Sequence, residues 1–266
     1  MGIPFDGELC HSLDPWVNHA CDEFKSTYGS NIHPKPKSLL KFGRIETLTT
    51  AQATIWQRAG HETYVSSNLI NKISSSDDTD TQQVKIEGHT VNASGDFEFV
   101  VQTVTLVGQT ETPLTTALAR ASRVYNIGAT DFGGTVYVYE DDTVSAGVPQ
   151  TSTKIHLQAA GENQSEKCAT TISSGDAWLL TGFFCAVAKK TSALADLDVQ
   201  VREKGSVFRP RIQTGVSTTG SNTSFVEIKP YIIVPPNADV RVVGAASTTG
   251  VACNAWLNGL LCHVVG

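Results

Sequence analysis

Four residues near the N-terminus have side chains of the kind that bind metal ions. Cys10, His11, His19 and Cys21 lie in one short segment, and thiolate and imidazole groups are the usual ligands of structural zinc. Their spacing matches no common zinc motif, and the chain contains no Cys-x-x-Cys pair. We therefore interpret the four as incidental residues of an irregular segment and predict no metal site.

Neighbouring carboxylates form the second group that could do chemistry. Asp77 with Asp78 and Asp141 with Asp142 are of the residue type that glycosidases use, but adjacent side chains in a strand or turn point in different directions. The acidic stretch ISSSDDTDT also lacks the glycine and the closing glutamate of a calcium-binding EF-hand loop. We interpret both pairs as solvated turn residues.

The search for catalytic motifs favours a protein without enzymatic activity. The chain contains no nucleophile elbow, phosphate-binding loop, dinucleotide-binding glycine motif or His-Glu-x-x-His pair, and its histidines are scattered. We predict no catalytic residue and no cofactor. A site assembled from distant loops would leave no such signature.

Net charge limits the classes of partner that the chain is expected to bind, and cysteine content indicates the compartment in which it is made. The net charge of −6 disfavours nucleic acid as the main ligand, and no stretch reaches the roughly 18 apolar residues of a membrane-spanning helix. The N-terminus has none of the features of a signal peptide. Cys185, Cys253 and Cys262 lie in apolar strand-like runs, where a thiol behaves as a small hydrophobe. We therefore expect reduced cysteines and synthesis in a cytoplasm.

Alternating β-type segments fill most of the chain. Residues 84–139 contain several runs in which β-branched and aromatic residues alternate with polar ones. The segment DLDVQVR places Leu197, Val199 and Val201 on one face of a strand. About ten strands without a blade-length repeat favour a jelly roll over a propeller. The sequence predicts an all-β protein with an antiparallel jelly-roll-like β-sandwich over residues 46–266.

Residues 1–45 differ from the rest and are predicted to form an extended, partly helical N-terminal arm. Asp14 as an N-cap and Pro15 at the first helical position predict a short helix over residues 14–28. The tract NIHPKPKSLLKFGR that follows contains four basic residues and no acidic one, and its prolines favour an extended path.

Two interpretations of this arm stay open, a solvated linker and an anchor on an acidic partner surface. Its large aromatic side chains favour the anchor, because a disordered linker has little use for them. The candidate partner-binding residues are Trp16, Phe24, Lys35, Lys37, Lys41, Phe42 and Arg44.

Several sequence segments between about residues 42 and 190 resemble a known group of proteins. It includes FGRIETLTTAQATIWQRAGHETYV, VVQTVTLVGQTETPL, ASRVYNIGATDFGGTVYVYEDDT and ENQSEKCATTISSGDAWLLTGFF. In sequence, these segments resemble the uncharacterised virion structural proteins of tailed bacteriophages. The arm before Phe42 is not part of this resemblance.

The resemblance implies a β-sandwich protein of the capsid exterior or the tail, often a homotrimer. Within that group we expect a decoration (cement) protein that binds the major capsid protein on the outer head and bridges capsomers. The expected location is the virion, after synthesis in the host cytoplasm. The alternative is a tail-associated or receptor-binding module that recognises carbohydrate, for which Tyr231, Trp178 and Trp256 are available aromatic residues. Because these three lie in or beside apolar runs, we expect them in the core.

Overall fold

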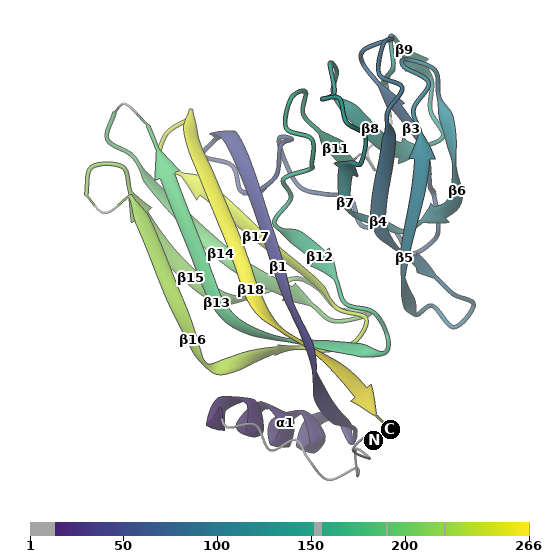
Figure 1. Cartoon of the computed structure of the whole chain (residues 1–266). Helices are drawn as coiled ribbons and strands as arrows, with labels where there is room; N and C mark the ends of the chain where they lie inside the picture. Colours follow the sequence, from purple (N-terminus) through teal and green to yellow (C-terminus); the bar gives the residue numbers. More distant parts are fainter. Residues whose placement is uncertain (1–13, 152–155, 190, 221, 266) are drawn as a thin grey trace.

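The computed structural model consists of two β-sandwiches and one helix (Figure 1), and it describes residues 14–151, 156–189, 191–220 and 222–265. Strands make up 58% of the structure and helix 6%. The all-β prediction is therefore confirmed. One sandwich is built from the two ends of the chain, and the other is inserted between them.

The first sandwich is a jelly roll of two antiparallel sheets. Sheet I has the order β1-β18-β13-β16, and sheet II has the order β12-β17-β14-β15, with β2 beside β17. Counted along this sandwich without β2, the orders are 1-8-3-6 and 2-7-4-5, which is the arrangement of a jelly roll. The strands are β1 (Asn31–Leu48), β2 (Ala53–Thr54), β12 (Ala169–Thr171), β13 (Asp176–Ala188), β14 (Leu194–Arg202), β15 (Arg209–Ser217), β16 (Thr223–Val234), β17 (Asp239–Ala246) and β18 (Val251–Val265).

The core of the jelly roll follows from the alternation seen in the sequence. Leu197, Val199 and Val201 of β14 are buried together against Trp178 and Phe183 of the facing sheet. The three strand residues predicted to share one face do so, and that face points inward. Cys185, Cys253 and Cys262 are buried, as expected from their apolar surroundings. Cys21 is disulfide-bonded, so the expectation of reduced cysteines is wrong for this residue.

The inserted sandwich occupies residues 70–158 and has its own core. Sheet III has the order β11-β8-β3-β6, sheet IV has the order β5-β4-β7, and β9 and β10 form a small hairpin. Buried residues such as Ile73, Ile86, Val124 and Val136 fill the space between the sheets. The strands are β3 (Ile70–Ser75), β4 (Gln83–Val91), β5 (Phe97–Thr105), β6 (Thr112–Leu118), β7 (Arg120–Asn126), β8 (Val136–Glu140), β9 (Val144–Ser145), β10 (Val148–Pro149) and β11 (His156–Gln158).

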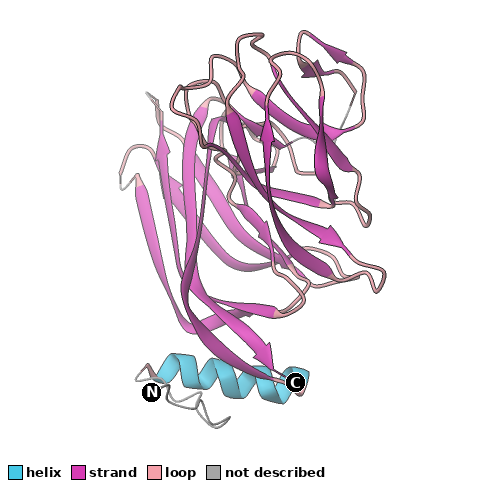
Figure 2. Ribbon diagram, turned by 45° about the vertical axis from the view of Figure 1, so that its right-hand side comes forward, coloured by secondary structure: helices cyan, strands magenta, loops and turns pink. Residues whose placement is uncertain are grey.

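Helix α1 (Pro15–Tyr28) lies across the lower end of the jelly roll in Figure 2. It begins as the sequence predicts, because the backbone N–H of Trp16 donates to Asp14 Oδ1 at 2.9 Å. It ends at Gly29, which adopts φ +70° and donates its N–H to the carbonyl of Lys25. Gly29 avoids the steric cost that a larger residue would have in this left-handed conformation.

The tract after the helix is part of the jelly roll, so the predicted boundary at residue 45 is wrong. Strand β1 pairs with β18 along most of its length, and residue 45 lies inside this pairing opposite Cys253. The arm was inferred from a change in composition. This tract is held by the pairing of β1 with β18, two strands that are far apart in the sequence. A local change in composition cannot reveal such a pairing. The predicted domain 46–266 likewise contains two sandwiches.

The two sandwiches meet at a buried ionic cluster. The Asp239 carboxylate of β17 accepts hydrogen bonds from Arg120 Nε of β7 at 3.0 Å and from Arg202 Nε of β14 at 3.1 Å. Thr171 Oγ1 donates to the same carboxylate at 2.6 Å. Burial raises the pKa of Asp239, but the charges and hydrogen bonds of the arginines outweigh it, so the pKa is lowered. One anion of the jelly roll therefore holds a cation of the inserted sandwich.

Candidate partner-binding face

The outer face of sheet I is covered at one end only. There, Val17, Ala20 and Phe24 of α1 pack on Leu179 of β13 and Cys262 of β18, with other apolar residues of the sheet around them. The rest of this outer face has no helix or sheet of the described chain packed on it. An uncovered sheet face normally presents polar side chains to water, so its composition is informative.

A row of four aromatic residues crosses the uncovered part of sheet I. Phe42 of β1 is opposite Trp256 of β18, Trp256 is opposite Phe184 of β13, and Phe184 is opposite Phe225 of β16. Directly opposite residues of antiparallel strands share one face of the sheet. Phe225 is 64% exposed and Trp256 is 38% exposed. Because strands are about 4.8 Å apart, the row spans roughly 14 Å. We call these four residues the aromatic row.

The rings of the row contact one another and the backbone below them. The centroids of Phe184 and Trp256 are 4.3 Å apart with the ring planes at 63°, a geometry that aromatic pairs favour. A Cβ at Gly182 would lie 3.3 Å from Cε2 of Phe225 and 2.4 Å from Oδ1 of Asn258. Glycine at position 182 therefore lets these two side chains lie close to the sheet.

The two rows that border the aromatic row contain mostly polar and charged residues, with Leu40 as an exposed apolar one. One neighbouring row consists of Arg44, Asn254, Ala186 and Thr223, and the other of Leu40, Asn258, Gly182 and Glu227. The charges are paired, with Arg44 Nη2 at 2.6 Å from Glu46 Oε1 and Lys229 Nζ at 2.6 Å from Glu227 Oε1. An apolar aromatic centre with a polar rim is the composition of a protein–protein interface.

The structure divides the seven partner-binding residues predicted from the sequence. Phe42 belongs to the aromatic row, and Arg44 lies in the row beside it. Trp16 is about one-third exposed on α1, the helix that covers the end of the sheet. The side chains of Lys35 and Lys37 lie outside the described part of the structure.

Two of the seven assignments are wrong, because the side chains are buried within the chain. Phe24 is 0% exposed between α1 and sheet I, where it contributes to the core that holds the helix. Lys41 is 8% exposed, and its Nζ donates to the carbonyl of Ser122 in the inserted sandwich at 3.1 Å. Both side chains are therefore occupied by contacts within the chain.

Replacing Lys41 with methionine should stabilise the protein at pH 7. Burial and the nearby Lys167 ammonium lower the pKa of Lys41 from 10.5 to about 8, which corresponds to a penalty of roughly 3 kcal/mol for the charged form. The methionine leaves the Ser122 carbonyl without this donor, at a cost of about 1 kcal/mol. We expect Lys41→Met to increase the free energy of unfolding by about 2 kcal/mol, measured by urea denaturation.

The pH dependence of this effect has a defined sign. Between pH 8 and 10.5 the unfolded chain keeps the Lys41 proton that the folded chain releases, so the penalty decreases as pH rises. The advantage of Lys41→Met should therefore be smaller at pH 10 than at pH 7. Lys229→Met, at an exposed position on sheet I, is the control. An equal or lower stability of Lys41→Met at pH 7 would contradict the assigned penalty.

Sequence analysis missed three of the four residues in the aromatic row. Trp178 and Tyr231 are buried, as expected, but Trp256 points outward. Phe184 lies in the largely apolar run AWLLTGFFCAVA, which does not show which of its residues face outward. Phe225 is followed directly by Val226, so the sequence does not decide which of these two neighbours faces the core. Only the pairing of strands distant in the sequence brings the four rings into one row.

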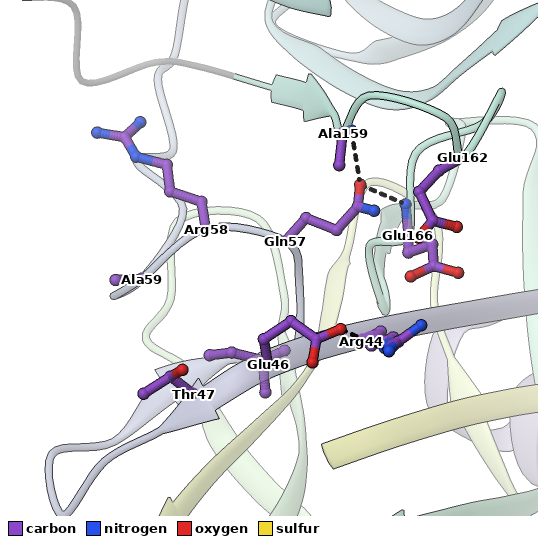
Figure 3. A pocket seen from close by; sticks show the side chains of 10 residues that line it. Arg44, Glu46, Thr47, Gln57, Arg58, Ala59, Ala159, Glu162 and Glu166 are labelled. Carbon is purple, nitrogen blue, oxygen red and sulfur yellow. Dashed lines mark hydrogen bonds and ion pairs between the residues drawn. The ribbon is translucent and has the colours of Figure 1, made fainter. Parts of the chain in front are cut away.

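A cavity of about 280 Å³ lies between β1, residues 57–59 and residues 159–166 (Figure 3). Gln57 Oε1 spans it by accepting hydrogen bonds from the backbone N–H groups of Ala159 and Glu166. Burial and the nearby Glu162 raise the pKa of Glu166. Arg44 and Arg58 also line the cavity, and Arg44 is paired with Glu46, which lines it as well.

The carboxylates and metal-ligand residues considered in the sequence analysis do not form a site in the described structure. Asp77 Oδ1 accepts from the N–H and hydroxyl of Thr79, and Asp142 accepts from Thr143 and Thr151, so both form turns. Among the described residues, no three His, Cys, Asp or Glu side chains gather as metal ligands. Cys10 and His11 lie outside the described residues.

Helix α1 falls short of the length and apolarity that a membrane span requires, and the described chain contains no helix that meets them.

Comparison with known proteins gives no family assignment. No protein-family model and no curated protein sequence matches this chain. The structure of infectious bursal disease virus Gx strain aligns at 7% identity over 89% of this chain and 72% of that chain, with a TM-score of 0.20. The VP2 subviral particle of infectious bursal disease virus aligns at 9% identity over 94% and 78%, with a TM-score of 0.24. At these TM-scores we transfer no residue role and no activity.

Proposed function

We propose that the chain is a non-enzymatic structural component of a virion that binds another protein through the outer face of sheet I. The observation behind this proposal is the aromatic row, which leaves Phe225 and Trp256 exposed on an otherwise ordered sheet. Burying such residues against a partner removes apolar area from water, and aromatic residues dominate the energy of many interfaces.

The rigidity of the face supports the same function. The four rings project from four hydrogen-bonded strands, so little conformational freedom is lost when a partner covers them. The jelly roll also recurs in viral capsid proteins, although it occurs in lectins and cupins as well, so fold alone does not decide between these functions.

Within this class, we propose a decoration protein that binds the major capsid protein on the outer head. The balanced charges of the rim suit a neutral protein surface better than a strongly acidic one. This replaces the anchor expected from the basic tract, since Lys41 is buried. The bound chain adds interface that must be broken before the shell can open.

The copy number of the chain in purified particles tests this role. Quantitative mass spectrometry of intact virions should find copies in proportion to the capsomers. Particles separated into heads and tails should retain the chain in the head fraction. A few copies per particle, found with the tail, would contradict the decoration role.

A carbohydrate-recognising module of the tail is the second candidate. The specific observation in its favour is Trp256, whose exposed indole lies between Asn254 and Asn258 along β18. Indole rings stack on sugars and amides bond to hydroxyl groups, but the other three members of the row are phenylalanines, which favour a protein partner. Binding of the isolated chain to a glycan array, lost in Trp256→Ser, would support this candidate instead.

A further inference from the structure

Strand β5 forms one edge of sheet IV, and its backbone orientation can be read from the hydrogen bonds near it. The N–H of Leu106 donates to the carbonyl of Gln82, and the N–H of Ile127 donates to the carbonyl of Gln83. Even-numbered residues of β4 therefore face β5, and their partners in β5 are also even-numbered. The odd-numbered residues of β5 direct their N–H and C=O groups away from the sheet.

This outward side of β5 is open in the described structure. At its start, the N–H of Phe97 donates to Asn237 Oδ1 and its carbonyl accepts from Ser174. Farther along, no described strand or side chain bonds to the backbone of Phe99, Val101 or Thr103. Strand β6 lies nearby, but the side chain of Gln102 makes the link to it.

The side chains of β5 are those of a strand that can pair further. Phe99 is 51% exposed and Val101 is 45% exposed, and the segment FVVQTVT consists mainly of aromatic and β-branched residues. Proteins usually protect edge strands with proline or lysine. The edge strands β6, β15 and β16 contain Pro113, Pro210 and Pro230, whereas β5 contains neither residue type.

We propose that β5 pairs antiparallel with β5 of a second copy of this chain, about a two-fold axis at Val101. Val101 then faces Val101 of the second copy, and Phe99 faces its Thr103. These three residue pairs would form about six backbone hydrogen bonds. The pairing joins two three-stranded sheets into one and removes both open edges.

The sequence of β5 is compatible with pairing to itself. Its one charged residue, Glu98, would face Val104 of the second copy. The two Glu98 side chains would then lie about 20 Å apart along the strands, so they would not repel each other strongly. A self-complementary patch of this kind gives a closed two-fold dimer. This inference goes beyond the proposed function and does not depend on it.

Sedimentation velocity of the full chain over a range of concentrations tests the dimer. We expect wild type to be dimeric. Val101→Lys places two ammonium groups at the axis, and Val101→Pro removes two backbone hydrogen bonds. Each should raise the dimer dissociation constant by roughly 30-fold or more. Val207→Lys, at a residue 67% exposed in the loop before β15, is the matched control and should stay dimeric.

Amide hydrogen exchange locates the contact independently. The N–H groups of residues 99, 101 and 103 should exchange slowly in the dimer and faster in monomeric Val101→Lys, whereas the even-numbered N–H groups of β5, which bond to β4, should stay protected in both. Val101→Lys keeps every backbone N–H, so this test does not depend on whether Val101→Pro folds. A monomeric or trimeric wild type would overturn the proposal. So would a dimer that persists in Val101→Lys or dissociates in Trp256→Ser, because the contact would then lie elsewhere. Loss of virion binding with an intact β5 dimer would bear only on the proposed function.

Discussion

Replacing both Trp256 and Phe225 with serine abolishes binding of the chain to its virion partner while the jelly roll stays folded. Each side chain is an exposed member of the aromatic row. Truncating an aromatic residue at the centre of an interface commonly costs about 2 kcal/mol or more, a factor of roughly 30 in affinity. The two together should raise the dissociation constant by about three orders of magnitude if their effects add.

The measurement is co-sedimentation of the purified chain with particles from which it has been removed. Exposed cross-strand aromatic pairs contribute only about 0.5–1 kcal/mol to stability, so the thermal unfolding temperature should change little. Leu194→Ser, at an equally exposed apolar residue of β14, is the control and should bind as wild type does. Undiminished binding by the double variant would show that the partner contacts another surface.

Asp239→Asn destabilises the protein by about 3–5 kcal/mol, because it leaves the buried Arg120 guanidinium and the partly buried Arg202 guanidinium without their counter-ion. Asp239 is 3% exposed and accepts hydrogen bonds from Arg120 and Arg202. The amide keeps the size of the side chain but not its charge. Since Arg120 belongs to the inserted sandwich, that sandwich should also unfold at a lower urea concentration than the jelly roll in this variant.

The effect of Asp239→Asn depends on pH in a predictable direction. The pKa of Asp239 is lowered below 3.8, so its stabilising contribution is present above that pH and is lost as pH falls through the folded-state pKa. Urea denaturation at pH 7 and in more acidic buffer below pH 4 should show the variant and wild type converging. Asp141→Asn, at an exposed carboxylate, is the control. A loss of less than about 1 kcal/mol at pH 7 would mean that the cluster is not needed to hold the two sandwiches together.

The sequence was sufficient to predict the elements that depend on neighbouring residues alone, such as α1 and the buried face of β14. Asp14, Pro15 and Gly29 define the ends of α1 within a single short segment. The alternation in β14 identifies its buried face because the side chains of a strand alternate regardless of its partners. The jelly-roll class follows from many such strands and short turns.

The features that depend on distant pairing could not be predicted in this way. Strand β1 looks like an arm because it contains Pro34, Pro36 and several lysines, but β18 at the other end of the chain completes its sheet. The inserted sandwich has the same alternating pattern as the jelly roll, so no change in composition separates them. The aromatic row likewise joins positions 42, 184, 225 and 256 through register alone.

The most direct test of the binding face is a reconstruction of the particle that contains this chain, at a resolution that shows side chains. The account predicts that the chain lies on the outer head, with Trp256 and Phe225 in contact with the major capsid protein. A chain whose aromatic row faces solvent while another surface makes the contact would contradict it, as would a chain located only at the tail.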